Sequence, residues 1–372
     1  MRVELANPSA DEREHSELLC ERIRAEIRAA DGAIGFDRYM ELALYAPGFG
    51  YYSAGATKFG AAGDFVTAPE LGFVFARCLA RAIASRARAA DIVELGPGSG
   101  ALAAELLLEL DRLGARPLRY RLLERSADLR DRQRATLASR CPQFAQSIEW
   151  LDAPPAESWR GVLIANEVAD ALPVRLFEWR DDRVFERCVG VDEANHFAWR
   201  EREADPAFDS EIQTLLADRS LPQPYRSEFC PLLAPWLAEV TSTLAEGDAC
   251  FIDYGSPRHD YYAPQRREGT LRCHYRHRAH DDPLILTGLQ DITAWVDFDA
   301  LGEAAISNGL HVDAFTTQAE FLIANGLDAV FAEAYDTASD EAARYRLAQE
   351  VKRLTLPGEM GDAFHVMTLR RS

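Results

Sequence analysis

The chain lacks several features that would place it in a membrane or outside the cell. It has no apolar run long enough to span a bilayer, and its first residues, Met1-Arg2-Val3-Glu4-Leu5, lack the apolar core of a secretion signal. Its seven cysteines contain no Cys-x-x-Cys pair, which favours reduced thiols over a disulfide framework. We therefore expect a cytoplasmic protein without a membrane span.

Basic residues are scarce relative to acidic ones. The 372 residues include 41 Lys and Arg against 60 Asp and Glu, which gives a formal net charge of −19. A field of this sign repels phosphate backbones and argues against a nucleic-acid substrate. It favours a cationic partner, such as an arginine-bearing protein segment, although solubility alone explains the charge equally well.

The most informative stretch of the chain is a glycine-dense turn. An apolar run over 91–95 leads into Gly96-Pro97-Gly98-Ser99-Gly100, and a helix-forming segment follows over 101–107. This pattern predicts a strand, a tight turn and a helix, where a ligand can approach bare backbone beside the helix N-terminus. Glu124 ends the next apolar strand, 28 residues after Gly96. An acid at that place can hold a ribose diol by two hydrogen bonds.

Two types of cofactor use this layout, dinucleotides and S-adenosylmethionine (SAM). Gly96-x-Gly98-x-x-Ala101 matches a variant of the dinucleotide fingerprint. Glu94 precedes the turn, however, and its carboxylate would oppose a pyrophosphate but attract the sulfonium and ammonium groups of SAM. The sequence therefore favours SAM over a dinucleotide, and over a turn that binds no ligand.

Strands and helices alternate along most of the chain, which indicates a mostly parallel sheet with helices on both faces. The polar residues that end successive strands then gather at one rim of the sheet. These rim residues are Glu94, Gly96, Glu124, Asp152, Asn166, Glu167 and Asp253.

Two segments interrupt the alternation of strands and helices. Residues 175–203 alternate apolar and polar residues around the turn signals Asp181-Asp182 and Asp192-Glu193, which predicts an antiparallel β-insertion. Residues 256–298 form a long loop-rich segment. Both segments follow strands that end at the rim, so we expect them to flank the mouth of the site.

A structureless segment rich in glycine and aromatic residues precedes a predicted helix. Thr67 and Pro69 suit the start of that helix, with Glu70 in its positive first turn. We expect the helix to continue to about Arg88.

Four separated motifs resemble, in the same order, those of the MidA-like methyltransferases. They are Gly63-Asp-Phe-Val-Thr-Ala-Pro-Glu70, Glu94-Leu-Gly-Pro-Gly-Ser-Gly100, Asn166-Glu-Val-Ala-Asp-Ala-Leu-Pro173 and Gly288-Leu-Gln-Asp-Ile-Thr-Ala-Trp-Val-Asp-Phe298. That family comprises class I SAM-dependent enzymes related to the mitochondrial factor that methylates an arginine during respiratory complex I assembly. The resemblance covers nearly the whole chain and implies protein arginine N-methyltransferase activity of the symmetric type, on a respiratory-complex subunit.

The resemblance also implies the architecture. It predicts a Rossmann-like class I methyltransferase fold of the α/β class, with a mostly parallel seven-stranded sheet. An N-terminal helical and aromatic-loop extension would cover residues 1–62. The SAM-binding domain would cover 63–372, with insertions at about 175–230 and 256–298.

The motifs imply a cofactor site for SAM. The glycine turn would contact the amino-acid end of SAM, Glu124 and Arg125 the ribose, and Leu151 and Asp152 the adenine. Phe65, Thr67 and Pro69 would form a lid, although helix entry and packing explain Thr67 and Pro69 nearly as well. The predicted cofactor-binding residues are Phe65, Thr67, Pro69, Glu94, Gly96, Pro97, Gly98, Gly100, Glu124, Arg125, Leu151, Asp152 and Asn166.

Glu167 and Asp170 are the predicted catalytic residues. Arginine stays protonated in proteins, and its planar fork of donors pairs well with carboxylates. Two acids at a strand end could orient the guanidinium, and one could accept the released proton. Asn166 could add a carbonyl acceptor. A role as helix N-cap explains Asp170 equally well.

One segment resembles a metal site without being predicted as one. Cys273-His274-x-x-His277-x-x-His280 has a spacing that can close a zinc site. The neighbouring arginines oppose a second positive charge, so we expect a basic loop over the pocket, with Gln290 and Asp291 in its wall.

Three other functions stay open on the sequence alone: a small-molecule or RNA methyltransferase, a non-catalytic assembly factor and, more distantly, a dehydrogenase. Asn166-Glu167 stands where adenine-directed enzymes have an Asn/Asp-Pro-Pro-aromatic run, which argues against that type. The intact glycine turn and Glu124 argue for a working cofactor site.

Overall fold

The computed structural model describes residues 5–53, 67–86, 90–217 and 219–372. Its central element is a sheet in the order β15-β16-β10-β5-β2-β3-β4, with β14 pairing to β10. The strands are β2 (Asp91–Leu95), β3 (Tyr120–Leu123), β4 (Ile148–Leu151), β5 (Trp159–Asn166), β10 (Leu244–Ser256), β14 (Val296–Asp297), β15 (His311–Thr317) and β16 (Phe364–Arg371).

The sheet is mostly parallel, as expected, because only β16 runs against its neighbours β10 and β15. It contains eight strands in the described residues, one more than predicted. The additional strand is the two-residue β14, which pairs with β10 at Gly255 and Ser256.

Helices cover both faces of the sheet, because each central strand is apolar on both sides. Ile92 and Ile164 belong to one core cluster and Val93 and Leu163 to another. On the first face lie α4 (Val74–Arg86), α5 (Ala101–Arg112), α6 (Ala127–Arg140), α11 (Gln318–Ala324), α12 (Leu327–Asp336) and α13 (Glu341–Thr355); on the second lie α8 (Leu233–Thr241) and α10 (Phe298–Ser307).

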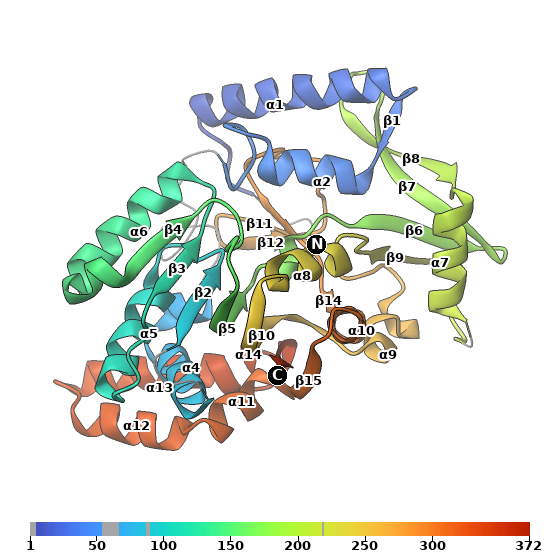
Figure 1. Cartoon of the computed structure of the whole chain (residues 1–372). Coiled ribbons are helices and arrows are strands. Elements are labelled where there is room, and N and C mark those ends of the chain that lie inside the picture. The colour runs from blue at the N-terminus through green and yellow to red at the C-terminus, as the bar shows by residue number, and fades with distance from the viewer. Residues whose placement is uncertain (1–4, 54–66, 87–89, 218) are drawn as a thin grey trace.

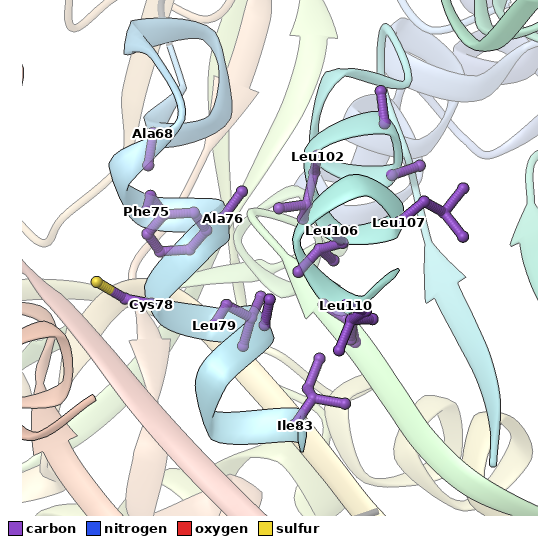
Figure 2. Packing of buried hydrophobic residues seen from close by; sticks show 14 of the residues in the cluster. Ala68, Phe75, Ala76, Cys78, Leu79, Ile83, Leu102, Leu106, Leu107 and Leu110 are labelled. Atoms are coloured by element: carbon purple, nitrogen blue, oxygen red, sulfur yellow. The ribbon is translucent and has the colours of Figure 1, made fainter. Parts of the chain in front are cut away.

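The packing of α4 against α5 shows how the first face is filled. Figure 2 shows Leu79 and Ile83 of α4 turned toward Leu106 and Leu110 of α5. All four side chains are almost completely buried. Because such contacts remove apolar surface from water, they are the main source of stability of this layer.

Two glycines let the central strands approach closely. Gly161 of β5 and Gly247 of β10 have φ angles of 150° and 135°. A Cβ on Gly161 would overlap the carbonyl oxygen of Asp91, and a Cβ on Gly247 would overlap that of Gly161. Both positions therefore exclude any larger residue.

A second sheet contains the predicted β-insertion. It consists of β6 (Arg175–Arg180), β7 (Arg183–Val191), β8 (Phe197–Glu203), β9 (Tyr225–Phe229) and β1 (Ala33–Gly35), and α7 (Pro206–Leu216) packs against β7. The strands over 175–203 are antiparallel, which confirms the prediction. Asp181 and Asp182, with φ angles of 49° and 56°, form the tight turn between β6 and β7.

The N-terminal segment joins this second sheet. α1 (Ala10–Ala29) and α2 (Phe36–Tyr45) flank β1, and β1 pairs with β7 at Gly190, Val189 and Cys188. Figure 1 shows α1 and α2 on the side of the molecule opposite α12 and α13. Ile34, Phe36 and Val189 share one core cluster.

The remaining elements are short. They are α9 (Arg258–Tyr261), α14 (Met360–Ala363), the hairpin strands β11 (Arg272–Tyr275) and β12 (Arg278–His280) with β13 (Asp291–Thr293), and the 3₁₀ turns Pro142–Ser147, Ala169–Ala171 and Pro264–Arg266. Within the described ranges, no helix is both long enough and apolar enough to cross a membrane.

The single helix expected from Thr67 to about Arg88 is wrong. The structure has a short helix, α3 (Ala68–Leu71), then Gly72 and Phe73, and then α4. The Glu350 carboxylate, which comes from α13, accepts the N–H of Val74 at 2.7 Å. It also fills the space that a side chain on Gly72 would need. This long-range cap starts a new helix at Val74.

Candidate active site

The glycine turn lies between the end of β2 and the start of α5, as the sequence predicted. Gly96, Gly98 and Gly100 have φ angles of 57°, 51° and 82°, a region that other residues rarely adopt. The N–H of Gly100 donates to the carbonyl of Pro97 at 2.8 Å, which closes the turn. Gly100 occupies the N-cap position of α5 and has no side chain to cap the helix, whereas the Ser99 hydroxyl accepts the N–H of Ala101 at 3.3 Å. The N–H groups of the residues that follow Ala101 in the first turn can face a ligand.

Glu124 lies directly after β3, beside this turn. Its carboxylate accepts the N–H of Ser126 at 2.8 Å on one oxygen and the side-chain amide of Gln133 at 3.2 Å on the other. Burial raises the pKa of this carboxyl above its ordinary value. Because a carboxylate has about four acceptor sites, both oxygens can still accept a hydroxyl donor, as a ribose diol requires.

The other predicted residues of this region lie at the ends of β3 and β4. The Nε atom of Arg125 donates to the carbonyl of Asp152 at 3.2 Å, next to Leu151 at the end of β4. Arg130, which was not predicted, donates to the carbonyl of Glu124 at 2.7 Å and to the Asp152 carboxylate at 2.7 Å. Arg130 therefore ties the two strand ends together.

The described residues include only part of the predicted lid. Phe65 lies outside the described residues, whereas Thr67 is buried and Pro69 lies in the first turn of α3. Thr67 occupies the N-cap position without a side-chain cap bond. Ser99 of the glycine turn donates to the carboxylate of Glu70, so α3 is anchored to the turn.

Glu94 lies inside the sheet rather than in the turn. Its side chain is 2% exposed, and its carboxyl accepts the Tyr120 hydroxyl at 2.7 Å. Burial raises its pKa to about 7. The carboxyl is therefore partly protonated at neutral pH. Its attraction to the sulfonium and ammonium groups of SAM is then weaker than the sequence predicted.

The loop after β5 brings the predicted catalytic residues to the glycine turn. A Cβ on Gly96 would lie 3.1 Å from Cγ2 of Val168, so the two loops are in close contact. Asn166 donates from its side-chain nitrogen to Glu167 at 3.1 Å, and its buried Oδ1 has no partner within the described structure. Glu167 has a φ angle of 54°, which is uncommon for a residue with a side chain.

Asp253, at the end of β10, holds this loop in place. Its Oδ2 atom accepts the N–H groups of Val168 at 3.2 Å, Ala169 at 2.9 Å and Asp170 at 3.2 Å. The alternative role of Asp170 as a helix N-cap is therefore wrong. Asp170 lies within the 3₁₀ turn Ala169–Ala171, and Asp253 supplies the cap instead.

Four carboxyl groups form an acidic cluster, which we define as Glu167, Asp170, Asp253 and Asp291. Burial raises the pKa of Glu167 to about 8, with a further contribution from Asp253. Burial, together with the three other acids, raises the pKa of Asp170 well above its ordinary value. In the described part of the chain, Glu167, Asp170 and Asp253 form no ion pair with a basic side chain.

Tyrosines border the acidic cluster. Tyr52 donates its hydroxyl to Asp291 at 2.9 Å, and Tyr45 donates to the carbonyl of Ala171 at 2.8 Å. The rings of Tyr45 and Tyr52 stack at a centroid distance of 5.5 Å. Asp291 thus lies at the cluster, while its place in the wall of a substrate pocket stays a prediction. The tyrosines were not predicted, and they come from the N-terminal segment.

The histidine-rich segment forms the β11–β12 hairpin. Cys273 pairs with His280 across the hairpin, and Arg276 and His277 form its turn. Burial lowers the pKa values of His274 and His280. Among the described residues, no group of three or more His, Cys, Asp or Glu side chains is placed to hold a metal ion.

Two cavities lie away from these residues. One, of about 220 Å³, lies between α4, α11 and the sheet, and its lining includes Leu79, Cys250 and Phe321. The other, of about 620 Å³, lies between α1, β8 and the segment that includes Thr287. Neither is lined by the glycine turn or by the acidic cluster.

Comparisons with known proteins agree with this geometry. Residues 74–316 match a family model of S-adenosyl-L-methionine-dependent methyltransferases. The mitochondrial protein arginine methyltransferase NDUFAF7 of Mus musculus is 28% identical, over 91% of this chain and 81% of its own. The protein of the same name from Danio rerio is 29% identical, over 91% of this chain and 84% of its own.

A solved structure is more similar. A crystal structure of a Burkholderia thailandensis protein bound to S-adenosyl-homocysteine is 42% identical. It has a TM-score of 0.93 and matches over 99% of this chain and 95% of that chain. A second, native crystal structure of a Burkholderia thailandensis protein is also 42% identical, with a TM-score of 0.90, over 99% of this chain and 95% of that chain.

The residues present fit the cofactor. Three glycines of the turn lack Cβ atoms beside the N-terminus of α5, and the acid after β3 keeps free acceptor sites. The cofactor is S-adenosyl-L-methionine, and the family model spans well over half of the chain. The chain thus belongs to this family of S-adenosyl-L-methionine-dependent methyltransferases.

Proposed function

We propose that this enzyme N-methylates an arginine side chain of a protein substrate in the cytoplasm. The observation that carries the proposal is the acidic cluster beside the glycine turn, in which Glu167, Asp170 and Asp253 form no ion pair within the described residues. Burying several carboxyl groups without a cation is costly, so the arrangement favours a cationic ligand.

A guanidinium group suits this site better than an ammonium group. Its planar fork can donate to two carboxylates at once, and it stacks well on aromatic rings. Glu167 and Asp170 supply the carboxylates, and the stacked pair Tyr45 and Tyr52 supplies a nearby aromatic wall. The names of the relatives from Mus musculus and Danio rerio support arginine as the methyl acceptor.

The raised pKa values bear on the transfer of a proton. In the free enzyme a Glu167 carboxyl with a pKa of about 8 is mostly protonated at neutral pH. A bound guanidinium favours the ionised form and expels that proton. The carboxylate can then accept the proton that the guanidinium loses on methylation. When bound, the cofactor supplies an electrophilic methyl group, and the protein mainly positions the acceptor.

The family resemblance extends the proposal to an arginine on a subunit of a respiratory complex, with symmetric methylation. Arginine-bearing subunits of such complexes are therefore the first substrates to test. The negative net charge of the chain supports a basic docking segment on the substrate.

The test is methyl transfer from radiolabelled SAM to a purified arginine-bearing subunit and to its Arg→Lys variant. We expect methylarginine from the first and no transfer to the second. Glu167→Gln should lower turnover on the order of a hundredfold or more while SAM affinity changes little, because a positioned charge is lost.

The matched control is Glu157→Gln, which changes an exposed acid and should leave transfer unchanged. Equal turnover by Glu167→Gln would refute the role of Glu167. Transfer to the Arg→Lys variant or to small molecules alone would refute the proposed substrate. SAM binding without any transfer would favour an assembly factor.

A further inference from the structure

Gln133 of α6 joins the two halves of the cofactor site. Its side chain is 0% exposed, although it carries a polar amide. The Nε2 atom donates to the carbonyl oxygen of Gly98 at 3.0 Å and to the carboxylate of Glu124 at 3.2 Å. One side-chain amide therefore contacts both the glycine turn and the acid after β3.

A third contact fixes the orientation of this amide. Trp150 of β4 donates from its indole nitrogen to Oε1 of Gln133 at 2.9 Å. An indole N–H can only donate, so the atom facing it has to be the amide oxygen. The two amide hydrogens then point at Gly98 and Glu124. In the reversed orientation all three contacts would pair like with like.

Backbone packing strengthens this connection. A Cβ on Gly100 would lie 3.3 Å from the Cα atom of Gln133, so α6 lies directly against the turn. Gln133 thereby fixes the position of the turn relative to Glu124, while Glu124 keeps its second oxygen on the N–H of Ser126.

We propose that Gln133 is a positioning residue for the cofactor. It holds the Gly98 carbonyl and the Glu124 carboxylate at the separation and orientation that the amino-acid end and the ribose of SAM require, and Trp150 fixes the orientation of its amide. This inference rests on the cofactor site and on the predicted ribose contact of Glu124. It does not depend on the identity of the methyl acceptor.

The first test uses Gln133→Glu and calorimetric titration of the full-length protein with S-adenosyl-homocysteine. At pH 8 the new carboxylate faces the Gly98 carbonyl and the Glu124 carboxylate, so we expect affinity to fall by about 30-fold or more. Burial and the neighbouring Glu124 should raise the pKa of the new carboxyl, so we expect more of it to be protonated at pH 6, where it can donate to one of them. Affinity should then recover to within about 5-fold of the wild type.

Gln143→Glu is the matched control, because Gln143 is exposed and also precedes β4. It should bind S-adenosyl-homocysteine like the wild type at both pH values. A Gln133→Glu protein whose loss of affinity is the same at pH 6 and pH 8 would overturn the proposal, because a packing defect alone does not titrate.

The second test keeps the proposal falsifiable if Gln133→Glu does not fold. Gln133→Met preserves length and removes both donors, and we expect affinity for S-adenosyl-homocysteine to fall by about 10-fold. In a Glu124→Gln background, Gln133→Met should lower the affinity for S-adenosyl-homocysteine by less than about 3-fold, because the carboxylate to which Gln133 donates is already absent.

Full additivity of the two substitutions would show that Gln133 does not act through Glu124 and would overturn the inference. Unchanged affinity in a folded Gln133→Met protein would do the same. Trp150→Phe, which keeps an aromatic ring but loses the donor, should produce a smaller loss of about 3-fold, because the amide oxygen of Gln133 loses its partner while both amide hydrogens keep their acceptors.

Discussion

The backbone N–H of Asp170 lies 3.2 Å from the carboxylate of Asp253, a residue that follows it by 83 positions in the sequence. The same carboxylate oxygen accepts two further N–H groups of the loop after β5. Asp253 thus holds the backbone of the loop that carries Glu167 and Asp170, although it is distant from both in the chain.

Asp253→Ala should therefore disturb both the fold and the reaction. Removing the acceptor leaves buried N–H groups unpaired, which should lower the free energy of unfolding by about 2–3 kcal/mol. Asp253→Asn keeps an acceptor oxygen and should lose less. Denaturant titration measures both changes. If Asp253→Ala is as stable as the wild type, the cap described here is not a stabilising contact.

Tyr52→Phe tests the aromatic side of the site. The ring stack with Tyr45 should remain, but the hydrogen bond to Asp291 is lost. We expect the KM for the arginine substrate to rise by about 10-fold, the scale of one hydrogen bond to a charged group, with SAM affinity unchanged. Steady-state kinetics measure this, with the exposed Tyr345→Phe as control. Equal KM values for the two variants would place the substrate elsewhere.

The buried acids predict a stability that falls as pH rises. Glu94 has a pKa of about 7 in the folded chain against an ordinary value of 4.5. A raised folded pKa means that the folded state holds the proton more tightly. This contribution is complete below about pH 4.5 and is lost as pH rises toward 7, at roughly 1.4 kcal/mol per pH unit.

Glu94→Gln should remove that slope and make the protein more stable than the wild type above pH 7. The Tyr120 hydroxyl can still donate to the new amide oxygen. Melting temperatures between pH 5 and pH 9 measure the difference in stability between the two proteins. The contributions of the other titrating groups cancel in this difference, because both proteins share them. An unchanged slope would mean that Glu94 is ionised in the folded chain across this range.

Gly161→Ala tests the close approach of the central strands. Its Cβ would overlap the carbonyl oxygen of Asp91, so the strands have to separate, and we expect a loss of about 3 kcal/mol or more. Gly309→Ala is the control for a glycine with a positive φ angle in open space, because its φ angle is 76° and no atom lies within 4 Å of the added Cβ. It should lose only about 1 kcal/mol. Equal losses would show that conformation, and not contact, makes Gly161 necessary.

The features that the sequence predicted well are local ones. The strand, turn and helix around Gly96 depend on adjacent residues, and so does the hairpin at Asp181 and Asp182. The break at Gly72 was missed because its cause, Glu350, comes from a distant helix. The cap supplied by Asp253 and the amide of Gln133 were missed for the same reason.

The predicted site residues divide in a similar way. Gly96, Glu124 and Glu167 lie at strand ends, and the parallel order of the sheet brings such ends together. Tyr45 and Tyr52 reach the same region through long-range contacts, the pairing of β1 with β7 and the packing of α2 against β6, β7 and β13, which no local pattern encodes. Periodicity indicates which face of an element is buried but not which distant segment covers it.

The position of β16 has a consequence for synthesis of the chain on the ribosome. β16 is made after β10 and β15 but lies between them, and each of the two pairs along most of its length with β16. At about 5–20 residues per second, β15 and the exposed edge of β10 remain unpaired for several seconds before β16 is synthesised. During that interval both edges can pair with other chains, so a truncated or stalled product ending before Phe364 should be prone to aggregation.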